Sequence, residues 1–126
     1  MPRSPAMGEI KRRWRDYRTA GGGRAVKKFP MSLRDADRAA IADEMKLVRE
    51  KGLREGNARH LRGGIWEARV DRGELTYRIL FASVGETGRI LLALEGFAKK
   101  TRKTPSTIVE LAEARLKDWN ARGDSR

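Results

Sequence analysis

Cysteine is absent from the 126-residue sequence, and histidine occurs once, at His60. Without cysteine, the chain has no disulfide framework and no thiolate ligands for a metal ion. A single histidine outside any H-E-x-x-H motif leaves a zinc hydrolase site with almost no ligands. We therefore expect no metal and no other cofactor, and a structural role for His60 in a loop-like stretch.

Long apolar runs are absent as well. No stretch approaches the roughly 18 consecutive apolar residues that a membrane-spanning helix needs. Residues 1–10 also lack the apolar segment of a secretory signal peptide. The sequence therefore predicts a cytoplasmic protein that does not enter a membrane.

Positive charge is what the sequence has in excess. The 29 Lys and Arg residues oppose 17 Asp and Glu residues, so the formal net charge is +12. Charged residues make up 37% of the chain, against about a quarter in an average globular protein. A folded protein of this charge is expected to bind a polyanion, and nucleic acid is the strongest candidate.

Apolar residues at helical spacing predict two long helices. The first covers residues 33–51, with Ser32 as its N-cap and Gly52 as its stop signal. The second begins at Thr104, which is a suitable N-cap residue, and Pro105 suits the first helical position.

Alternating apolar and polar residues predict three adjacent strands, over residues 65–71, 74–82 and 89–97. The glycine-containing turns between them have hairpin length, so these strands are expected to form an antiparallel meander. Residues 10–17 alternate more weakly and predict an edge strand.

The order of these elements predicts a single domain of the α+β class. We expect the domain to span residues 10–122, with residues 1–9 as a flexible leader and residues 123–126 as a tail. A short helical turn is predicted over residues 24–31, before the first long helix.

The basic residues form two runs in the sequence. The first consists of Lys11, Arg12, Arg13, Arg15 and Arg18. The second consists of Lys99, Lys100, Arg102 and Lys103. The second run follows the last predicted strand and precedes a helix N-terminus, whose backbone amides also attract anions. A basic loop can equally be solvated surface, and the first run can be a docking patch.

Two strands of the predicted meander place charged residues on one face. Because side chains alternate along a strand, Glu67, Arg69 and Arg78 emerge opposite the apolar residues. Glu95, near the end of the third strand, can join them. Two alternatives remain open: Glu67 and Arg69 can form a pair that serves the fold, and Arg78 can be a solvent-facing spacer.

Three segments carry a resemblance to a known family. They are Leu61–Val70 (LRGGIWEARV), Tyr77–Phe81 (YRILF) and Leu92–Pro105 (LALEGFAKKTRKTP). Together they resemble the HigB-like, phage-derived branch of the RelE/ParE toxin superfamily of type II toxin–antitoxin systems. The resemblance implies a RelE-like fold, in which an N-terminal helical hairpin packs on a twisted antiparallel sheet with a C-terminal helix.

The resemblance also implies a function in a bacterial host cell, encoded by the bacterium, a phage or a prophage. Such toxins act as ribosome-dependent mRNA endoribonucleases, cleave mRNA in the ribosomal A site and so inhibit translation. Cleavage proceeds by attack of the 2′-OH without a metal ion. The partners implied are mRNA, the ribosome with its rRNA, and a cognate helix-turn-helix antitoxin.

The implied catalytic residues are those that can stabilise the charge of a phosphorane or move a proton. They are Arg78, Arg69, Lys100, Lys99, Glu67 and Glu95. Glu67 is a possible base or orienting group, and Glu95 stands where the family usually has a histidine. The remaining basic residues are expected to bind RNA or the ribosome, namely Lys11, Arg12, Arg13, Arg15, Arg18, Arg102 and Lys103.

Two other functions are compatible with the sequence. One is a ParE-like poison that binds DNA gyrase and cleaves no RNA. The other is a non-catalytic phage protein that binds nucleic acid or an antitoxin. The charged sheet face favours the endoribonuclease, because a gyrase poison does not need convergent phosphate-binding groups there.

Overall fold

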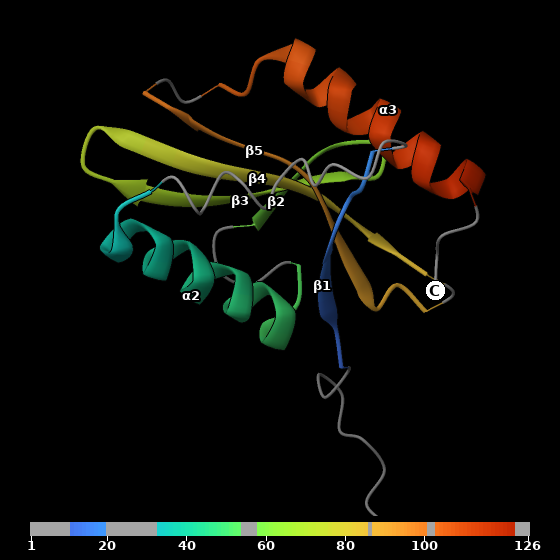
Figure 1. Cartoon of the computed structure of the whole chain (residues 1–126), viewed down its shortest axis with the longest axis horizontal. Coiled ribbons are helices and arrows are strands. Elements are labelled where there is room, and N and C mark those ends of the chain that lie inside the picture. Colours follow the sequence, from blue (N-terminus) through green and yellow to red (C-terminus); the bar gives the residue numbers. More distant parts are fainter. Residues whose placement is uncertain (1–10, 20–32, 54–57, 86, 101–102, 123–126) are drawn as a thin grey trace, which may run out of the picture.

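The structure, a computed structural model, describes residues 11–19, 33–53, 58–85, 87–100 and 103–122. It is an α+β fold in which a five-stranded sheet carries α2 on one face and α3 on the other (Figure 1). The elements in chain order are β1 (Arg13–Asp16), α2 (Asp35–Lys51), β2 (Ala58–Arg62), β3 (Ile65–Arg72), β4 (Leu75–Val84), β5 (Ile90–Lys99) and α3 (Ser106–Arg122). No helix within these described ranges is long and apolar enough to cross a membrane.

The predicted antiparallel meander is confirmed for β3, β4 and β5, but the sheet as a whole is mixed, which corrects the antiparallel sheet that the resemblance implied. Its strand order is β1-β5-β4-β3-β2. Strands β2 to β5 pair antiparallel with their sequence neighbours, whereas β1 pairs with β5 in parallel, from Arg13 opposite Ile90 to Asp16 opposite Ala93. Glycine turns reveal hairpins between consecutive strands, but a parallel partner lies far away in the sequence and leaves no such local signal.

The stretch around His60 is strand β2, so the prediction of a loop there is wrong. β2 forms a hairpin with β3 through Gly63, whose φ of 54° lies in the left-handed region that glycine adopts easily. The His60 Nε2 atom lies 2.7 Å from the Gly63 carbonyl oxygen. The His60 ring centroid lies 5.3 Å from that of Trp66. The lone histidine therefore belongs to the hairpin, in agreement with its expected structural role.

Helix α2 lies where the apolar spacing predicts it, although its N-terminal cap differs. The helix begins at Asp35, with Arg34 at the N-cap position and no side-chain cap hydrogen bond, so the prediction of Ser32 as the cap is wrong. Its end is predicted correctly. Gly52 has a φ of 101°, and its backbone N–H donates a hydrogen bond to the Val48 carbonyl oxygen.

Helix α3 begins at Ser106, later than the sequence predicts. The Pro105 carbonyl oxygen accepts hydrogen bonds from the N–H groups of Ile108 and Val109, at 3.1 and 3.2 Å. Thr104 therefore lies before the cap position, which corrects the prediction that it is the N-cap. Its hydroxyl bonds to the sheet instead, as described below.

The N-terminal helical hairpin is not confirmed. Among the described residues, α2 is the one helix that precedes strands β2 to β5. The helical turn predicted over residues 24–31, the leader at residues 1–9 and the tail at residues 123–126 all lie outside the described residues.

Each face of the sheet has its own apolar core. The core beneath α2 consists of Ile41, Val48, Ala68, Tyr77, Ile79, Phe81, Leu91 and Ala93. The core beneath α3 consists of Tyr17, Ile65, Leu80, Ala82, Val84, Ile90, Leu92, Leu94, Val109, Ala112 and Trp119. Because strand side chains alternate between these two cores, β4 and β5 are apolar on both faces, as expected of central strands.

Candidate functional site

The three charged residues predicted to share a sheet face do share it. On β3 and β4, Arg69 pairs with Arg78 in the sheet register, and Glu67 pairs with Leu80 of the α3 core. All three therefore point toward the α3 side. The side chain of Arg78 is 0% exposed and that of Glu67 is 1% exposed. This burial excludes the alternative that Arg78 is a solvent-facing spacer.

Thr104 joins the two buried charges. Its hydroxyl oxygen accepts a 2.8 Å hydrogen bond from Arg78 Nη1, and its hydroxyl donates a hydrogen bond to Glu67 Oε2. The direct distance from Arg78 Nη1 to Glu67 Oε2 is 3.9 Å, too long for a hydrogen bond. The hydroxyl therefore completes a chain of contacts, Arg78–Thr104–Glu67, which we call the buried network.

Arg69 lies between this network and the solvent. Its Nε atom is 3.7 Å from Glu67 Oε1, and its side chain is 24% exposed. Arg59 of β2 lies opposite Glu67 in the register and adds a further positive charge. Burial lowers the pKa of Arg78, Glu67 opposes this effect, and the charges of Arg69 and Arg59 lower the pKa further. The site thus concentrates positive charge around one buried carboxylate.

The basic end of β5 lies on the same side of the sheet. Lys99 pairs with Thr76, two residues before Arg78 on β4, and so faces the same way as Arg78. Lys100 and Lys103 are exposed. Arg102, the other residue predicted in this run, lies outside the described residues. Ammonium groups near a helix N-terminus and two arginines form an environment suited to a phosphate.

Glu95 also faces α3, because β5 contains a bulge. Leu80 pairs with Glu95 whereas Phe81 pairs with Ala93, which leaves Leu94 as the extra residue of β5. Glu95 Oε2 lies 3.5 Å from Arg115 Nη1 of α3, and its side chain is 21% exposed. Glu67 and Glu95 thus flank Leu80 on one face, each held by an arginine.

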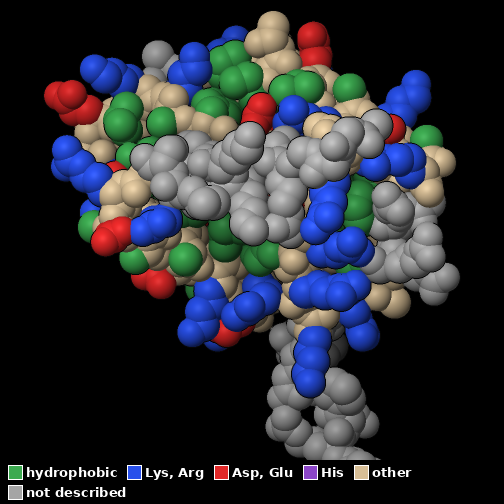
Figure 2. Space-filling view, viewed as in Figure 1, with side chains coloured by type: hydrophobic (Ala, Val, Ile, Leu, Met, Phe, Trp, Pro, Cys, Tyr) green, Lys and Arg blue, Asp and Glu red, His purple; other side chains and the backbone are tan. Residues whose placement is uncertain are grey.

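The N-terminal basic run does not form one surface. Arg12 donates a hydrogen bond to the Arg49 carbonyl oxygen of α2, whereas the Arg15 guanidinium lies 5.2 Å from the Trp119 ring of α3. Alternation along β1 therefore divides the run between the two faces. Lys11, Arg13 and Arg18 are exposed. In Figure 2, Lys and Arg side chains gather over β1 and the adjacent end of α2.

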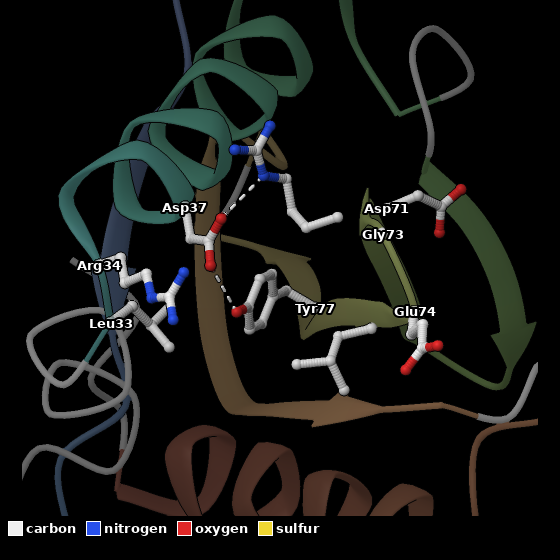
Figure 3. Close-up of a pocket in the computed structure, with 9 residues that line it drawn as sticks. Leu33, Arg34, Asp37, Asp71, Gly73, Glu74 and Tyr77 are labelled. Atoms are coloured by element: carbon white, nitrogen blue, oxygen red, sulfur yellow. Dashed lines mark hydrogen bonds and ion pairs between the residues drawn. The ribbon is translucent and has the colours of Figure 1, made fainter.

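A separate polar cluster lies on the α2 face, beside a cavity of about 640 Å³. The Tyr77 hydroxyl donates a 2.7 Å hydrogen bond to Asp37 Oδ2, and Arg72 Nε donates one of 2.8 Å to Oδ1 (Figure 3). These bonds lower the pKa of Asp37, and the bond to Asp37 together with burial raises the pKa of Tyr77. Asp37 thus binds both Tyr77 and Arg72 and fastens α2 to the β3–β4 hairpin.

Comparison with known proteins identifies the family. Residues 28–117 match the family described as "Phage derived protein Gp49-like (DUF891)". The chain is 35% identical over 126 residues to the "Probable endoribonuclease HigB1" of Mycobacterium tuberculosis, in strains CDC 1551 / Oshkosh and ATCC 25618 / H37Rv. Each alignment covers 98% of this chain and 95% of the relative.

The chain belongs to the Gp49-like, HigB-like family. The resemblance drawn from the sequence motifs is therefore confirmed. The match to a full-length relative also shows that the family likeness extends well beyond the three motif segments.

Three polar residues of this candidate site are not among the site residues that the sequence predicts. Thr104 is the next-to-last residue of the motif Leu92–Pro105 and is predicted as a helix cap, and Arg59 lies in a stretch predicted to be a loop. Arg115 shares the helical spacing of the α3 core residues, and its guanidinium also donates a hydrogen bond to the Leu94 carbonyl oxygen. Only the position of Thr104 inside a motif rich in Lys and Thr offered a signal.

Among the described residues, no group of three or more His, Cys, Asp and Glu side chains is arranged to hold a metal ion.

Proposed function

We propose that the chain is the toxin of a type II toxin–antitoxin system and a ribosome-dependent mRNA endoribonuclease. The observation that carries this proposal is the convergence of Arg69, Arg78 and Glu67 on the α3 face, beside the basic end of β5. The name of the Mycobacterium tuberculosis relative, a probable endoribonuclease, supports the same reaction class.

The proposed reaction is a transesterification within the RNA. The 2′-oxygen bonds to the adjacent phosphorus, the bond from phosphorus to the 5′-oxygen breaks, and the products are a 2′,3′-cyclic phosphate and a 5′-OH. The pentavalent phosphorane carries extra negative charge, so positively charged groups fixed at that place lower its free energy. Arg69 and Lys99 provide this charge in place of a metal ion, and the buried Arg78 adds a further positive charge from within the sheet.

Two proton transfers complete the reaction. An arginine is a poor base because its pKa exceeds about 12, so the acceptor for the 2′-OH proton must be another group. Glu95 is the more exposed of the two carboxylates, and we assign it that role, in the position where relatives usually have a histidine. Lys99 or Lys100 supplies the proton to the departing 5′-oxygen. Glu67 is buried and acts by orienting Arg69 and Arg78.

The excess positive charge is proposed to attract the ribosome. The residues assigned to rRNA or mRNA contact are Lys11, Arg12, Arg13, Arg15, Arg18, Arg102 and Lys103. Exposed basic residues neutralise backbone phosphates without reading a sequence, so their affinity for RNA falls steeply with salt concentration. The A site of the ribosome then supplies the geometry that the cleavage needs.

A toxin of this kind requires an inhibitor. We propose that a neighbouring gene encodes a helix-turn-helix antitoxin, whose contact is mostly acidic or occludes the basic face. Induction of the toxin gene alone is expected to stop the growth of a host that lacks the neighbour. Unimpaired growth of that host would count against the toxin assignment.

The test is to map mRNA 5′ ends after induction and, with purified protein, after incubation with translating ribosomes. We expect cuts positioned within codons when ribosomes are present, and none in the same RNA without ribosomes. Intact mRNA together with an SOS response would instead identify a ParE-like gyrase poison. Intact mRNA without that response, but with retained RNA or antitoxin binding, would identify a non-catalytic binding protein.

A further inference from the structure

Thr104 lies between the basic end of β5 and the first turn of α3, and its hydroxyl faces the sheet. It follows Lys103 directly and precedes Pro105, whose carbonyl oxygen accepts the first hydrogen bonds of α3. Instead of capping the helix, the Thr104 hydroxyl contacts Arg78 and Glu67. The segment that carries the exposed lysines is therefore tied to the buried charges at this residue.

The two contacts require a hydroxyl group in particular. The oxygen accepts from Arg78 Nη1 while the proton is donated to Glu67 Oε2, and only a group that both donates and accepts can do this. The gap of 3.9 Å between Arg78 Nη1 and Glu67 Oε2 is not closed by a direct hydrogen bond. Both side chains are almost fully buried, where water does not easily replace a lost partner.

We propose that Thr104 is a positioning residue for RNA cleavage. By joining Arg78 to Glu67, it fixes the carboxylate that holds Arg69, and it anchors the lysine-bearing segment next to that arginine. This inference rests on the proposed endoribonuclease function. Thr104 touches neither the phosphate nor the reacting hydroxyl in this scheme. Its loss should therefore slow the chemical step while leaving RNA and ribosome binding intact.

The experiment compares the full-length chain with Thr104→Val and Thr104→Ser. Valine keeps the shape of threonine and removes the hydroxyl, whereas serine keeps the hydroxyl. Thr107→Val, at an exposed position in the first turn of α3, is the matched control. The readouts are the single-turnover cleavage rate of a ribosome-bound mRNA at saturating protein and the protein concentration that gives half of that rate.

We expect Thr104→Val to lower the saturating rate by about 10- to 100-fold, the range set by the loss of a hydrogen bond to a charged group. The half-saturating concentration should stay unchanged, Thr104→Ser should restore most of the rate, and Thr107→Val should match the unmodified chain. Circular dichroism and melting temperature identify a variant that fails to fold. If Thr104→Val fails to fold, the folded Thr104→Ser variant decides: a rate near that of the unmodified chain supports the hydroxyl, and a rate at least 10-fold lower overturns it.

Three results separate the possible failures. If the unmodified chain cleaves and folded Thr104→Val cleaves equally well, the role of Thr104 is overturned and the endoribonuclease function stands. If Thr104→Val raises only the half-saturating concentration, Thr104 is a binding residue and the positioning role is also overturned. If the unmodified chain cleaves no ribosome-bound mRNA, the function itself fails, and the role of Thr104 fails with it.

Discussion

The two faces of the sheet carry the same kind of helix clamp but differ in what lies beneath the helix. On the α2 face, Tyr77 and Arg72 both bind Asp37. On the α3 face, the Tyr17 hydroxyl donates a 2.7 Å hydrogen bond to Asp118 Oδ2. Arg122 Nη2 lies 2.9 Å from the same oxygen. In each clamp a tyrosine binds a helix aspartate, and the arginine beside that aspartate comes from β3 on the α2 face and from α3 itself on the α3 face.

The difference lies in the strands themselves. Only on the α3 face do described strand residues place charges in the interior, with Glu67 and Arg78 at 1% and 0% exposure. The free energy lost by removing two charges from water often exceeds the free energy gained from their attraction, so a buried pair of this kind is weak evidence for stability. The clamps explain how the helices are held, whereas the buried pair calls for another explanation, which the proposed cleavage site provides.

The strongest test of this difference between the two faces uses two arginines of β3. Arg69 faces the α3 side, and Arg72 faces the α2 side, where it binds Asp37. We expect Arg69→Ala to lower mRNA cleavage by about 100-fold or more, because it removes a fixed charge from the phosphorane. Arg72→Ala should leave the cleavage rate nearly unchanged. Equal effects of the two substitutions on single-turnover cleavage would place the site elsewhere.

The second test concerns the buried pair of Arg78 and Glu67. Arg78→Met removes the fully buried arginine beside Glu67 and leaves Arg69, at 3.7 Å, as a charged neighbour of that carboxylate, so it should lower the free energy of unfolding by about 3 kcal/mol. The double variant Arg78→Met, Glu67→Leu should recover most of that loss and still fail to cleave mRNA. Urea unfolding measures the first effect and the ribosome assay the second. A double variant that is stable and active would show that the pair has no catalytic purpose.

The clamps should behave as structural contacts. Tyr17→Phe and Tyr77→Phe each remove one hydroxyl that donates to an aspartate. We expect each to lower the free energy of unfolding by about 1 kcal/mol at neutral pH and to leave cleavage unchanged. A large loss of cleavage in folded Tyr77→Phe would move the functional site toward the α2 face.

The smallest expected effects concern pH. The pKa of each tyrosine is raised, first by its hydrogen bond to aspartate and then by burial. The unfolded chain releases these protons first, so stability falls as the pH rises above the ordinary tyrosine pKa of 10.0. Double replacement of Tyr17 and Tyr77 by phenylalanine should flatten this alkaline decline in melting temperature. An unchanged decline would mean that other groups cause it.

The acid side of the stability curve should report on the α2 clamp. Hydrogen bonds from Arg72 and then Tyr77 lower the pKa of Asp37 below its ordinary value of 3.8. Its contribution to stability is therefore present above that pH and is lost as the pH falls through the lowered pKa. Asp37→Asn should weaken the acid dependence of the melting temperature, which a pH series of thermal unfolding measures. A steeper acid dependence in Asp37→Asn would contradict the assigned cause.

Local patterns account for much of the fold. Helix α2 and its end at Gly52, the position of α3 and the antiparallel run β3–β4–β5 follow from spacing and turn residues within a few positions of each other. The family, too, could be predicted from short motifs in the sequence. The hairpin around His60 was missed because its charged residues do not alternate with apolar ones, although the strand pairs with β3.

The sequence by itself determined that Glu67, Arg69 and Arg78 share a face, because side chains alternate along each strand and the short turn between β3 and β4 fixes their register. Only the tertiary structure decided the rest. The parallel pairing of β1 with β5, the burial of Arg78 and the contact of Thr104 with that arginine each join residues distant in the chain. A local pattern specifies the direction of a side chain, but the neighbours that cover it come from elsewhere in the fold. For this reason the alternation of β4 gives the direction of Arg78, but its complete burial and its contact with Thr104 are properties of the folded chain.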